Sequence, residues 1–192
     1  GRSINHVKVG TGPMPILLWS QMHGDEPTAT AALFDVFNYL SKHRGEPAVQ
    51  RILSQLTLHV VPMLNPDGAE RFQRRNAQSI DINRDAHQLV HEETRAVSRM
   101  FFEWHPTVVH DLHESVALLM SWNGTGPYNP NIDPITLSEF QALSFHEVQT
   151  LTSFGMPGAS TWNFGEAFAH LYLDSVAMNH NSIGRGYGAC GN

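Results

Sequence analysis

The sequence predicts a layered α/β domain, in which the strands of one sheet alternate with helices that cover it. Short apolar runs that suit buried strands alternate with longer segments whose apolar residues recur at helical spacing. No internal repeat or low-complexity stretch interrupts this alternation. A chain of 192 residues, 41% of them hydrophobic, is long enough to bury a core of ordinary size. We therefore expect residues 1–192 to form a single domain.

Two strands and a helix are predicted in the first part of the chain. Ile16 to Ser20 is a short apolar run that suits a buried strand. Pro27 to Lys42 is expected to be a helix that has proline in its first turn. Its apolar residues recur with helical spacing at Ala29, Ala32, Leu33, Val36, Phe37 and Leu40. Leu56 to Leu64 is expected to be a second buried strand, which the turn Asn65-Pro66-Asp67-Gly68 closes.

The second part of the chain continues the alternation and then becomes irregular. Val90 to Trp104 is expected to be a helix, Thr107 to Leu112 a third strand, and Thr136 to Thr152 another helix. From Ser153 onward the sequence favours loops. We interpret Gly184-Arg185-Gly186-Tyr187-Gly188 as a flexible loop, because no strand-to-helix context supports a phosphate-binding loop there.

Composition excludes several classes of partner. The formal net charge is -6 and the basic residues form no run, which argues against nucleic acid and anionic membranes. No apolar stretch approaches the roughly 20 residues of a membrane span, and Gly1 does not begin a signal peptide. We expect a soluble protein. The lone Cys190 leaves the compartment undecided, and a bacterial cytoplasm and a periplasm are both compatible with it.

Three short segments predict a metal site. They are His23-Gly24-Asp25-Glu26, Asn65-Pro66-Asp67-Gly68 and Asp111-Leu112-His113-Glu114. Two histidines and one carboxylate, with a fourth position open to water, are a common ligand set of hydrolytic zinc centres. These residues follow predicted strands, where sites gather in α/β sheets. A single histidine at a strand end is more often structural, but the combined set favours zinc. Strand alternation places Asp111 on the face of His113 and His110 on the other face.

An arginine-rich and asparagine-rich segment adds a second indication. It runs from Arg74 to Asp85 and reads Arg-Arg-Asn-Ala-Gln-Ser-Ile-Asp-Ile-Asn-Arg-Asp. Beside a metal, such side chains suit the binding of a carboxylate and the stabilisation of an oxyanion. Taken alone, the same segment could equally be a solvated charged loop.

Together these motifs resemble those of the zinc carboxypeptidase family of the carboxypeptidase A type. His-x-x-Glu, Asn-Pro-Asp-Gly, Arg-x-Asn-Ala-x-x-Ile-Asp-x-Asn-Arg and a strand that ends in histidine occur in the family's order over residues 1–120. The resemblance implies a three-layer fold, with a mixed central sheet flanked by helices on both faces. It also implies one zinc ion held by His23, Glu26 and His113. Gly1 to Gly10 resembles the family's leading hairpin.

The resemblance also implies how a substrate would bind. Arg74 would polarise the scissile carbonyl, and Asn83 and Arg84 would hold the terminal carboxylate of the substrate. Arg75 is the alternative to Arg74, although adjacent residues of an extended segment point apart. Asp25, in His-Gly-Asp-Glu, makes the chain similar to bacterial murein-peptide amidases. The expected partner is a peptide or murein peptide with a free carboxylate.

One element of the family's machinery is missing from the sequence. The general-base glutamate normally comes near the end of the domain, where this chain has Gly188, and the last glutamate is Glu166. The chain is therefore either a peptidase truncated at its C-terminus or a zinc-binding pseudoenzyme that recognises peptide ends without cleaving them. A third alternative is a deacylase of the aspartoacylase and succinylglutamate desuccinylase type, which shares the His-x-x-Glu and distant histidine. The Asn-Pro-Asp-Gly turn favours a zinc metallocarboxypeptidase.

Overall fold

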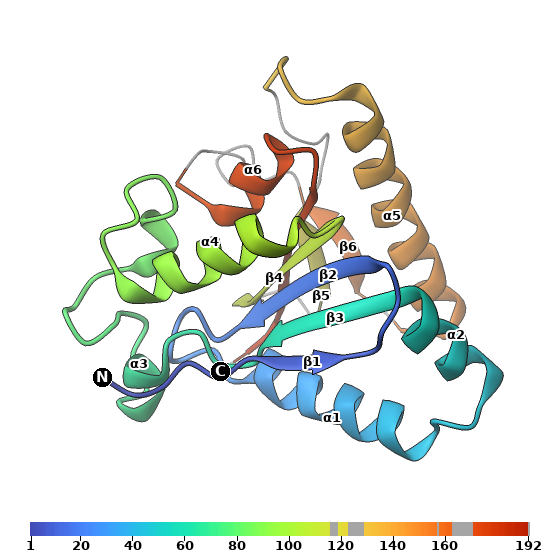
Figure 1. Cartoon of the computed structure of the whole chain (residues 1–192), viewed down its shortest axis with the longest axis horizontal. Coiled ribbons are helices and arrows are strands. Elements are labelled where there is room, and N and C mark those ends of the chain that lie inside the picture. Colours follow the sequence, from blue (N-terminus) through green and yellow to red (C-terminus); the bar gives the residue numbers. More distant parts are fainter. Residues whose placement is uncertain (116–118, 123–128, 157, 163–170, 192) are drawn as a thin grey trace.

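A mixed β-sheet forms the centre of the molecule (Figure 1). The computed structural model describes residues 1–115, 119–122, 129–156, 158–162 and 171–191. Within them the sheet has the order β1-β3-β2-β4-β7-β5-β6. Neighbouring strands are parallel except for the antiparallel pairs β1–β3 and β5–β7. The strands are β1 (Val7–Val9), β2 (Met14–Ser20), β3 (Leu56–Val61), β4 (Val108–Ser115), β5 (Leu119–Trp122), β6 (Ala159–Trp162) and β7 (Ile183–Cys190).

Helices cover both faces of this sheet, which confirms the predicted three-layer α/β architecture. Helices α4 and α6 pack on one face, and α1 and α5 pack on the other. No helix in the described ranges is both long and apolar enough to cross a membrane. The helices are α1 (Thr28–Lys42), α2 (Pro47–Gln55), α3 (Pro66–Glu70), the short 3₁₀ helix η1 (Ile82–Arg84), α4 (Glu92–Trp104), α5 (Pro134–Ser153) and α6 (Leu173–Met178).

The larger hydrophobic core lies between the sheet and the α4–α6 layer. Alternate residues of β2, Leu17 and Trp19, point into it and are fully buried. They meet Val97 and Phe101 of α4 and Ala177 of α6. Burial of a side chain such as Leu17, Val97 or Phe101 contributes about 1.5–3 kcal/mol. This packing fixes β2 and β4 rigidly, and the predicted metal site lies at their carboxyl ends.

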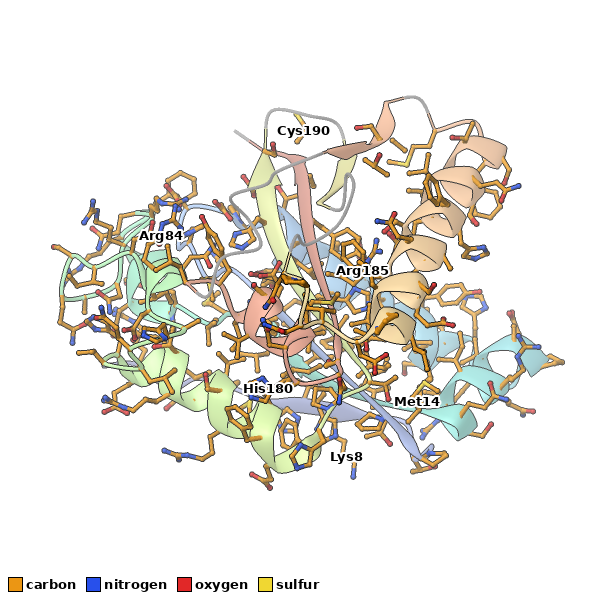
Figure 2. The ribbon with its side chains drawn as sticks, turned by 90° about the horizontal axis from the view of Figure 1, so that it is seen from above. Lys8, Met14, Arg84, His180, Arg185 and Cys190 are labelled. Carbon is orange, nitrogen blue, oxygen red and sulfur yellow. The ribbon has the colours of Figure 1, made fainter. Side chains whose placement is uncertain are left out.

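A buried polar network lies on the opposite face, beneath α5 (Figure 2). The guanidinium of Arg185 on β7 contacts Glu147 and Ser144 of α5 and donates to the Phe140 carbonyl at 3.0 Å. Tyr187 donates to Glu147 at 2.6 Å and lies 3.1 Å from Nδ1 of His110. Burial and then the charge of Arg185 lower the pKa of His110 to about 4. The contact with Tyr187 places His110 on the face of the sheet opposite His113, as strand alternation predicts.

The interpretation of the chain beyond Ser153 as loops was wrong, because β6, α6 and β7 all lie there. Gly184 to Gly188 lie in β7, which pairs with the central strand β4. The glycines occupy alternate positions and leave one face of the strand bare. A Cβ on Gly184 would lie only 2.0 Å from the carbonyl oxygen of Asp174, so glycine lets α6 approach β7 closely. A strand without side chains on one face shows no apolar alternation in its sequence.

The N-terminal region also differs from the expected hairpin. Only β1 is a strand there, and it pairs antiparallel with β3. Residues 1–6 form no strand, and Arg2 reaches Asp67 at 3.0 Å and Glu70 at 3.3 Å on α3. Helix α2 was not predicted, since Val49 is its one buried residue. The other predicted strands and helices of the described chain are confirmed within a few residues.

Candidate metal centre

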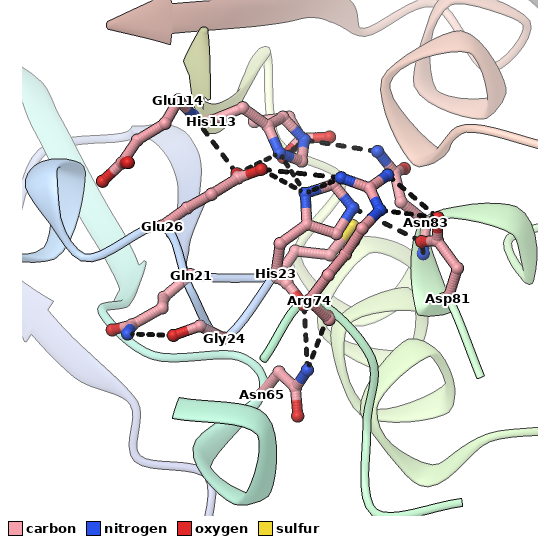
Figure 3. Close-up of polar contacts among 12 residues, drawn as sticks. Gln21, His23, Gly24, Glu26, Asn65, Arg74, Asp81, Asn83, His113 and Glu114 are labelled. Atoms are coloured by element: carbon pink, nitrogen blue, oxygen red, sulfur yellow. Dashed lines mark hydrogen bonds and ion pairs between the residues drawn. The ribbon is translucent and has the colours of Figure 1, made fainter. Parts of the chain in front are cut away.

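Two parallel strands bring distant parts of the sequence together. β2 and β4 are neighbours in the sheet, so the residues that follow β2 meet those at the end of β4 (Figure 3). His23 lies just past β2, Glu26 lies before α1, and His113 lies near the end of β4. These three side chains form the one described group of histidine and carboxylate residues that could hold a metal ion.

The turn Asn65-Pro66-Asp67-Gly68 supports the histidine loop and places no donor in this group. Asn65 caps α3 by accepting from the Gly68 amide at 2.9 Å, and it donates to the Met22 carbonyl at 3.2 Å. A Cβ on Gly24 would lie 2.1 Å from the carbonyl carbon of Gly68. The glycines therefore allow the loop and the turn to pack together, which fixes the position of His23.

The candidate ligand atoms point at one another. Nδ1 of His23 lies 2.7 Å from Oε1 of Glu26, and Nδ1 of His113 lies 2.9 Å from Oε2 of the same carboxylate. The two Nδ1 atoms are 3.1 Å apart. Both histidines are almost completely buried, with 3% and 2% of their surface exposed. Only ligand atoms that share a proton or a cation are stable at such distances.

This geometry fits zinc. Zinc bonds to nitrogen and oxygen are about 2.0–2.2 Å long, so neighbouring ligand atoms of a tetrahedral site lie about 3.3 Å apart. The separations among His23, Glu26 and His113 are close to that value, and a small outward movement would admit the ion. The donor set leaves one position open, as hydrolytic zinc centres require.

A carboxylate lies beside the outer nitrogen of each histidine. Nε2 of His23 lies 3.3 Å from Oδ1 of Asp81, and Nε2 of His113 lies 2.9 Å from Oδ1 of Asp111. Metal-binding histidines usually donate their second N–H to such a partner, which fixes the tautomer and the ring orientation. Both rings are therefore oriented with Nδ1 toward the candidate metal position.

The close contacts within this group shift the pKa values of Glu26 and His113. Burial opposes ionisation of Glu26, but hydrogen bonds from His113 and His23 outweigh it and lower its pKa to about 2. Burial likewise opposes a charge on His113, yet the charge and hydrogen bond of Asp111, and then Glu26, raise its pKa to about 10.

Arg74 lies at the open side of this group. Its Nε and Nη2 donate to Oδ2 of Asp81 at 3.0 and 2.9 Å, and Nη1 is 3.1 Å from His23 Nδ1 and 3.6 Å from Glu26. Despite opposing burial, the bonds and charges of His23 and Arg74 lower the pKa of Asp81. Arg75 instead donates to the Ser79 carbonyl at 2.8 Å. The structure thus brings Arg74, and not its neighbour, to the candidate site.

The predicted carboxylate-binding residues occupy different positions. Asn83 is buried, and its side-chain nitrogen lies 3.4 Å from His113 Nε2. Arg84 is exposed, donates to the Asn83 carbonyl at 2.8 Å, and places its guanidinium 5.0 Å from the ring centre of Tyr172 (Figure 2). Among the described contacts, Asn83 reaches the candidate ligand His113, and Arg84 reaches none of the three candidate ligands.

A glycine of β7 lies beside the third candidate ligand. Gly188 pairs with His113 in the register of β4 and β7, so the residue beside the third candidate ligand has no side chain. Glu114 is close in sequence, but its carboxylate accepts from the Thr28 amide at 2.7 Å and caps α1. Glu166, the last glutamate of the chain, lies outside the described residues.

Sequence reasoning did not assign a role to Asp81, Asp111 or Asp174. The alternation that separates His110 from His113 already puts Asp111 beneath His113, and that signal was available. Asp174 comes from the short helix α6, and no motif marks it. Burial and the charge of Asp111 raise the pKa of Asp174 to about 7.

The fold and this group define an α/β protein with a candidate metal centre of the hydrolytic type. The family model described as zinc carboxypeptidase matches residues 1–154, and the chain belongs to this family. Carboxypeptidase 2 of Trichophyton rubrum is 31% identical over 102 residues, which cover 52% of this chain and 19% of that protein. Carboxypeptidase SOL1 of Arabidopsis thaliana is 38% identical over 65 residues, or 33% of this chain and 13% of that protein.

Solved structures show the same fold. A metallo-carboxypeptidase from Burkholderia cenocepacia superposes with a TM-score of 0.80 at 18% identity, covering 99% of this chain and 52% of that one. A succinylglutamate desuccinylase/aspartoacylase from Rhodobacter sphaeroides gives 0.62 at 16% identity, covering 96% of this chain and 51% of that one. The chain therefore spans about half the length of these structures and a fifth or less of the two curated relatives above.

Proposed function

We propose that this chain carries the zinc centre of a metallocarboxypeptidase that hydrolyses a peptide or amide bond next to a free carboxylate. The observation that carries the proposal is the convergence of His23, Glu26 and His113, with the Arg74 guanidinium 3.1 Å from a candidate ligand atom. Zinc in this position would polarise the scissile carbonyl and activate water at neutral pH.

The chain's own residues would bind and orient the substrate. Arg74 can donate to the carbonyl oxygen as negative charge develops there, since Asp81 already holds its guanidinium in place. Asn83 and Arg84 would bind the terminal carboxylate, Asn83 from beside His113 and Arg84 from the end of η1. Binding of the carboxylate would then place the last peptide bond of the substrate over the metal group. A murein peptide with a free carboxylate is the substrate class that Asp25 suggests.

Gly188 favours a second candidate, a zinc-binding module that recognises peptide ends without cleaving them. A glycine beside His113 cannot accept a proton from water. The two candidates share the metal and the carboxylate pocket, and they differ in turnover alone. The deacylase alternative has weaker support, because the family model that matches residues 1–154 is that of the zinc carboxypeptidases.

One set of measurements separates these candidates. The chain is stripped with a chelator, reloaded with zinc, and offered an N-blocked dipeptide, its C-terminal amide, a murein tripeptide and an N-acyl amino acid. A peptidase binds one zinc per chain and cleaves the free acid but not the amide. Zinc binding with saturable binding of the free acid and no turnover supports the recognition module. Turnover of the N-acyl amino acid alone supports a deacylase, and failure to bind zinc contradicts all three.

A further inference from the structure

A buried carboxylate lies directly behind the candidate ligand His113. Asp111 precedes it by two residues on β4, so both side chains point to the same face of the sheet. Oδ1 of Asp111 lies 2.9 Å from Nε2 of His113, and Asp111 is only 1% exposed. Figure 3 shows that His113 turns its other ring nitrogen, Nδ1, toward Glu26.

Asp111 has no other described partner for its charge. Its contact with His113 is an ion pair, and neither carboxylate oxygen accepts a well-formed hydrogen bond from the residues that the structure describes. A buried carboxylate without a partner costs several kcal/mol, so natural proteins pair such a group. The group that Asp111 faces is the His113 ring, which can carry a positive charge. A metal bound to Nδ1 would place positive charge on the ring, as a proton there would. The Nε2–H group that faces Asp111 would then be a stronger hydrogen-bond donor.

A second buried acid lies near Asp111. Asp174 on α6 is 1% exposed, and its Oδ2 likewise lacks a described partner. It is near enough for the charge of Asp111 to help raise its pKa. Gly184, on the bare face of β7, lets α6 approach, because a Cβ there would lie 2.0 Å from the Asp174 carbonyl oxygen. With 1% of its surface exposed, Asp111 is shielded from water.

Asp111 differs in this respect from the carboxylate behind the other histidine. Asp81 divides its oxygens between His23 and two hydrogen bonds from Arg74, and 19% of its side chain is exposed. Asp81 therefore serves both a candidate ligand and the candidate substrate-binding arginine. Asp111 serves His113 alone.

We propose that Asp111 is a positioning residue of the metal centre, which holds Nε2–H of His113 so that Nδ1 binds the metal. The inference rests on the proposed zinc centre and adds the residue that sets the tautomer and orientation of its third ligand. It predicts that the affinity for zinc depends on the charge of Asp111, although Asp111 never touches the ion.

The test compares Asp111→Asn with Asp85→Asn. Asp85 is also buried, at 4% exposure, but its carboxylate accepts from the amides of Val90 and His91 and belongs to no part of the site. The zinc dissociation constant is measured by competition with a chromogenic chelator. Asp111→Asn is expected to weaken zinc binding about 10- to 100-fold, as loss of an outer-shell partner does. Asp85→Asn is expected to leave it unchanged, whatever it does to the melting temperature.

Equal zinc affinity in Asp111→Asn and the native chain would overturn the inference and leave the zinc centre intact. A native chain that binds no zinc would overturn the zinc centre itself, and the inference with it. A spectroscopic test needs no variant, in case Asp111→Asn does not fold. Nitrogen-15 spectra of the zinc-loaded native chain are expected to show His113 metallated at Nδ1, with an Nε2 proton protected from exchange. Metallation at Nε2, or a freely exchanging proton, would contradict the role of Asp111.

Discussion

Replacing Arg74 with alanine separates a functional role for this residue from a structural one. The guanidinium makes two hydrogen bonds to Asp81, but 42% of the Arg74 side chain is exposed. Ion pairs exposed to this degree contribute about 0–1 kcal/mol to folding. The substitution is therefore expected to lower the free energy of unfolding by less than about 1 kcal/mol.

The expected effect on catalysis is much larger. A donor placed where negative charge develops in the transition state accounts for about 100- to 1,000-fold in kcat, or about 3–4 kcal/mol. Arg74→Ala should therefore lose at least about 100-fold in kcat/KM with its zinc content unchanged, if the zinc-loaded chain hydrolyses peptides as proposed. In the recognition module, the same variant should bind the free-acid peptide with little change, because Asn83 and Arg84 are retained.

The assay pairs thermal unfolding with hydrolysis of a blocked dipeptide, and Arg75→Ala is the matched control. Arg75 is the adjacent arginine, and it donates to the Ser79 carbonyl away from the metal group. Arg75→Ala should retain nearly full activity. An active Arg74→Ala variant, or equal losses in the two variants, would refute the assignment of the oxyanion role to Arg74.

Three other predictions concern the metal, the substrate and stability. His113→Ala should bind no zinc at micromolar concentration by elemental analysis, because it removes one of three ligands; full occupancy would exclude His113 from the site. Arg84→Ala should weaken a peptide with a free C-terminus far more than its amide in a calorimetric titration, and equal losses would contradict the carboxylate role. Asp174→Asn should change how the stability of the metal-free chain depends on pH. Folding raises the pKa of Asp174 from 3.8 to about 7, so the folded state keeps this proton at a pH where the unfolded chain has lost it. The free energy of unfolding should therefore fall as the pH rises from about 4 to about 7. This loss of stability is at most about 4 kcal/mol. Chemical denaturation at several pH values should show a smaller loss in Asp174→Asn than in the native chain. An unchanged profile would show that Asp174 is not the group that binds the proton.

The candidate ligands could be predicted because each belongs to a local pattern at the end of a strand. His23 and Glu26 are three residues apart between β2 and α1, and His113 lies near the end of β4. Parallel neighbouring strands carry such residues to one edge of a sheet. The same reasoning placed His110 on the opposite face, and the structure confirms it.

What could not be predicted depends on contacts between elements far apart in the sequence. β7 has alternate glycines because α6 packs against its bare face, so the strand lacks the apolar alternation that would reveal it. Asp174 reaches the site from that same helix. The pairing of Arg185 with Glu147 joins β7 to α5 across 38 residues, and neither residue belongs to a recognisable motif.

The most direct test of the zinc centre is a crystal structure of the zinc-loaded chain with anomalous diffraction data collected at the zinc edge. One anomalous peak is expected, about 2.0–2.2 Å from Nδ1 of His23, Nδ1 of His113 and the Glu26 carboxylate. A peak elsewhere in the chain, or coordination through Nε2 of either histidine, would contradict the proposed centre.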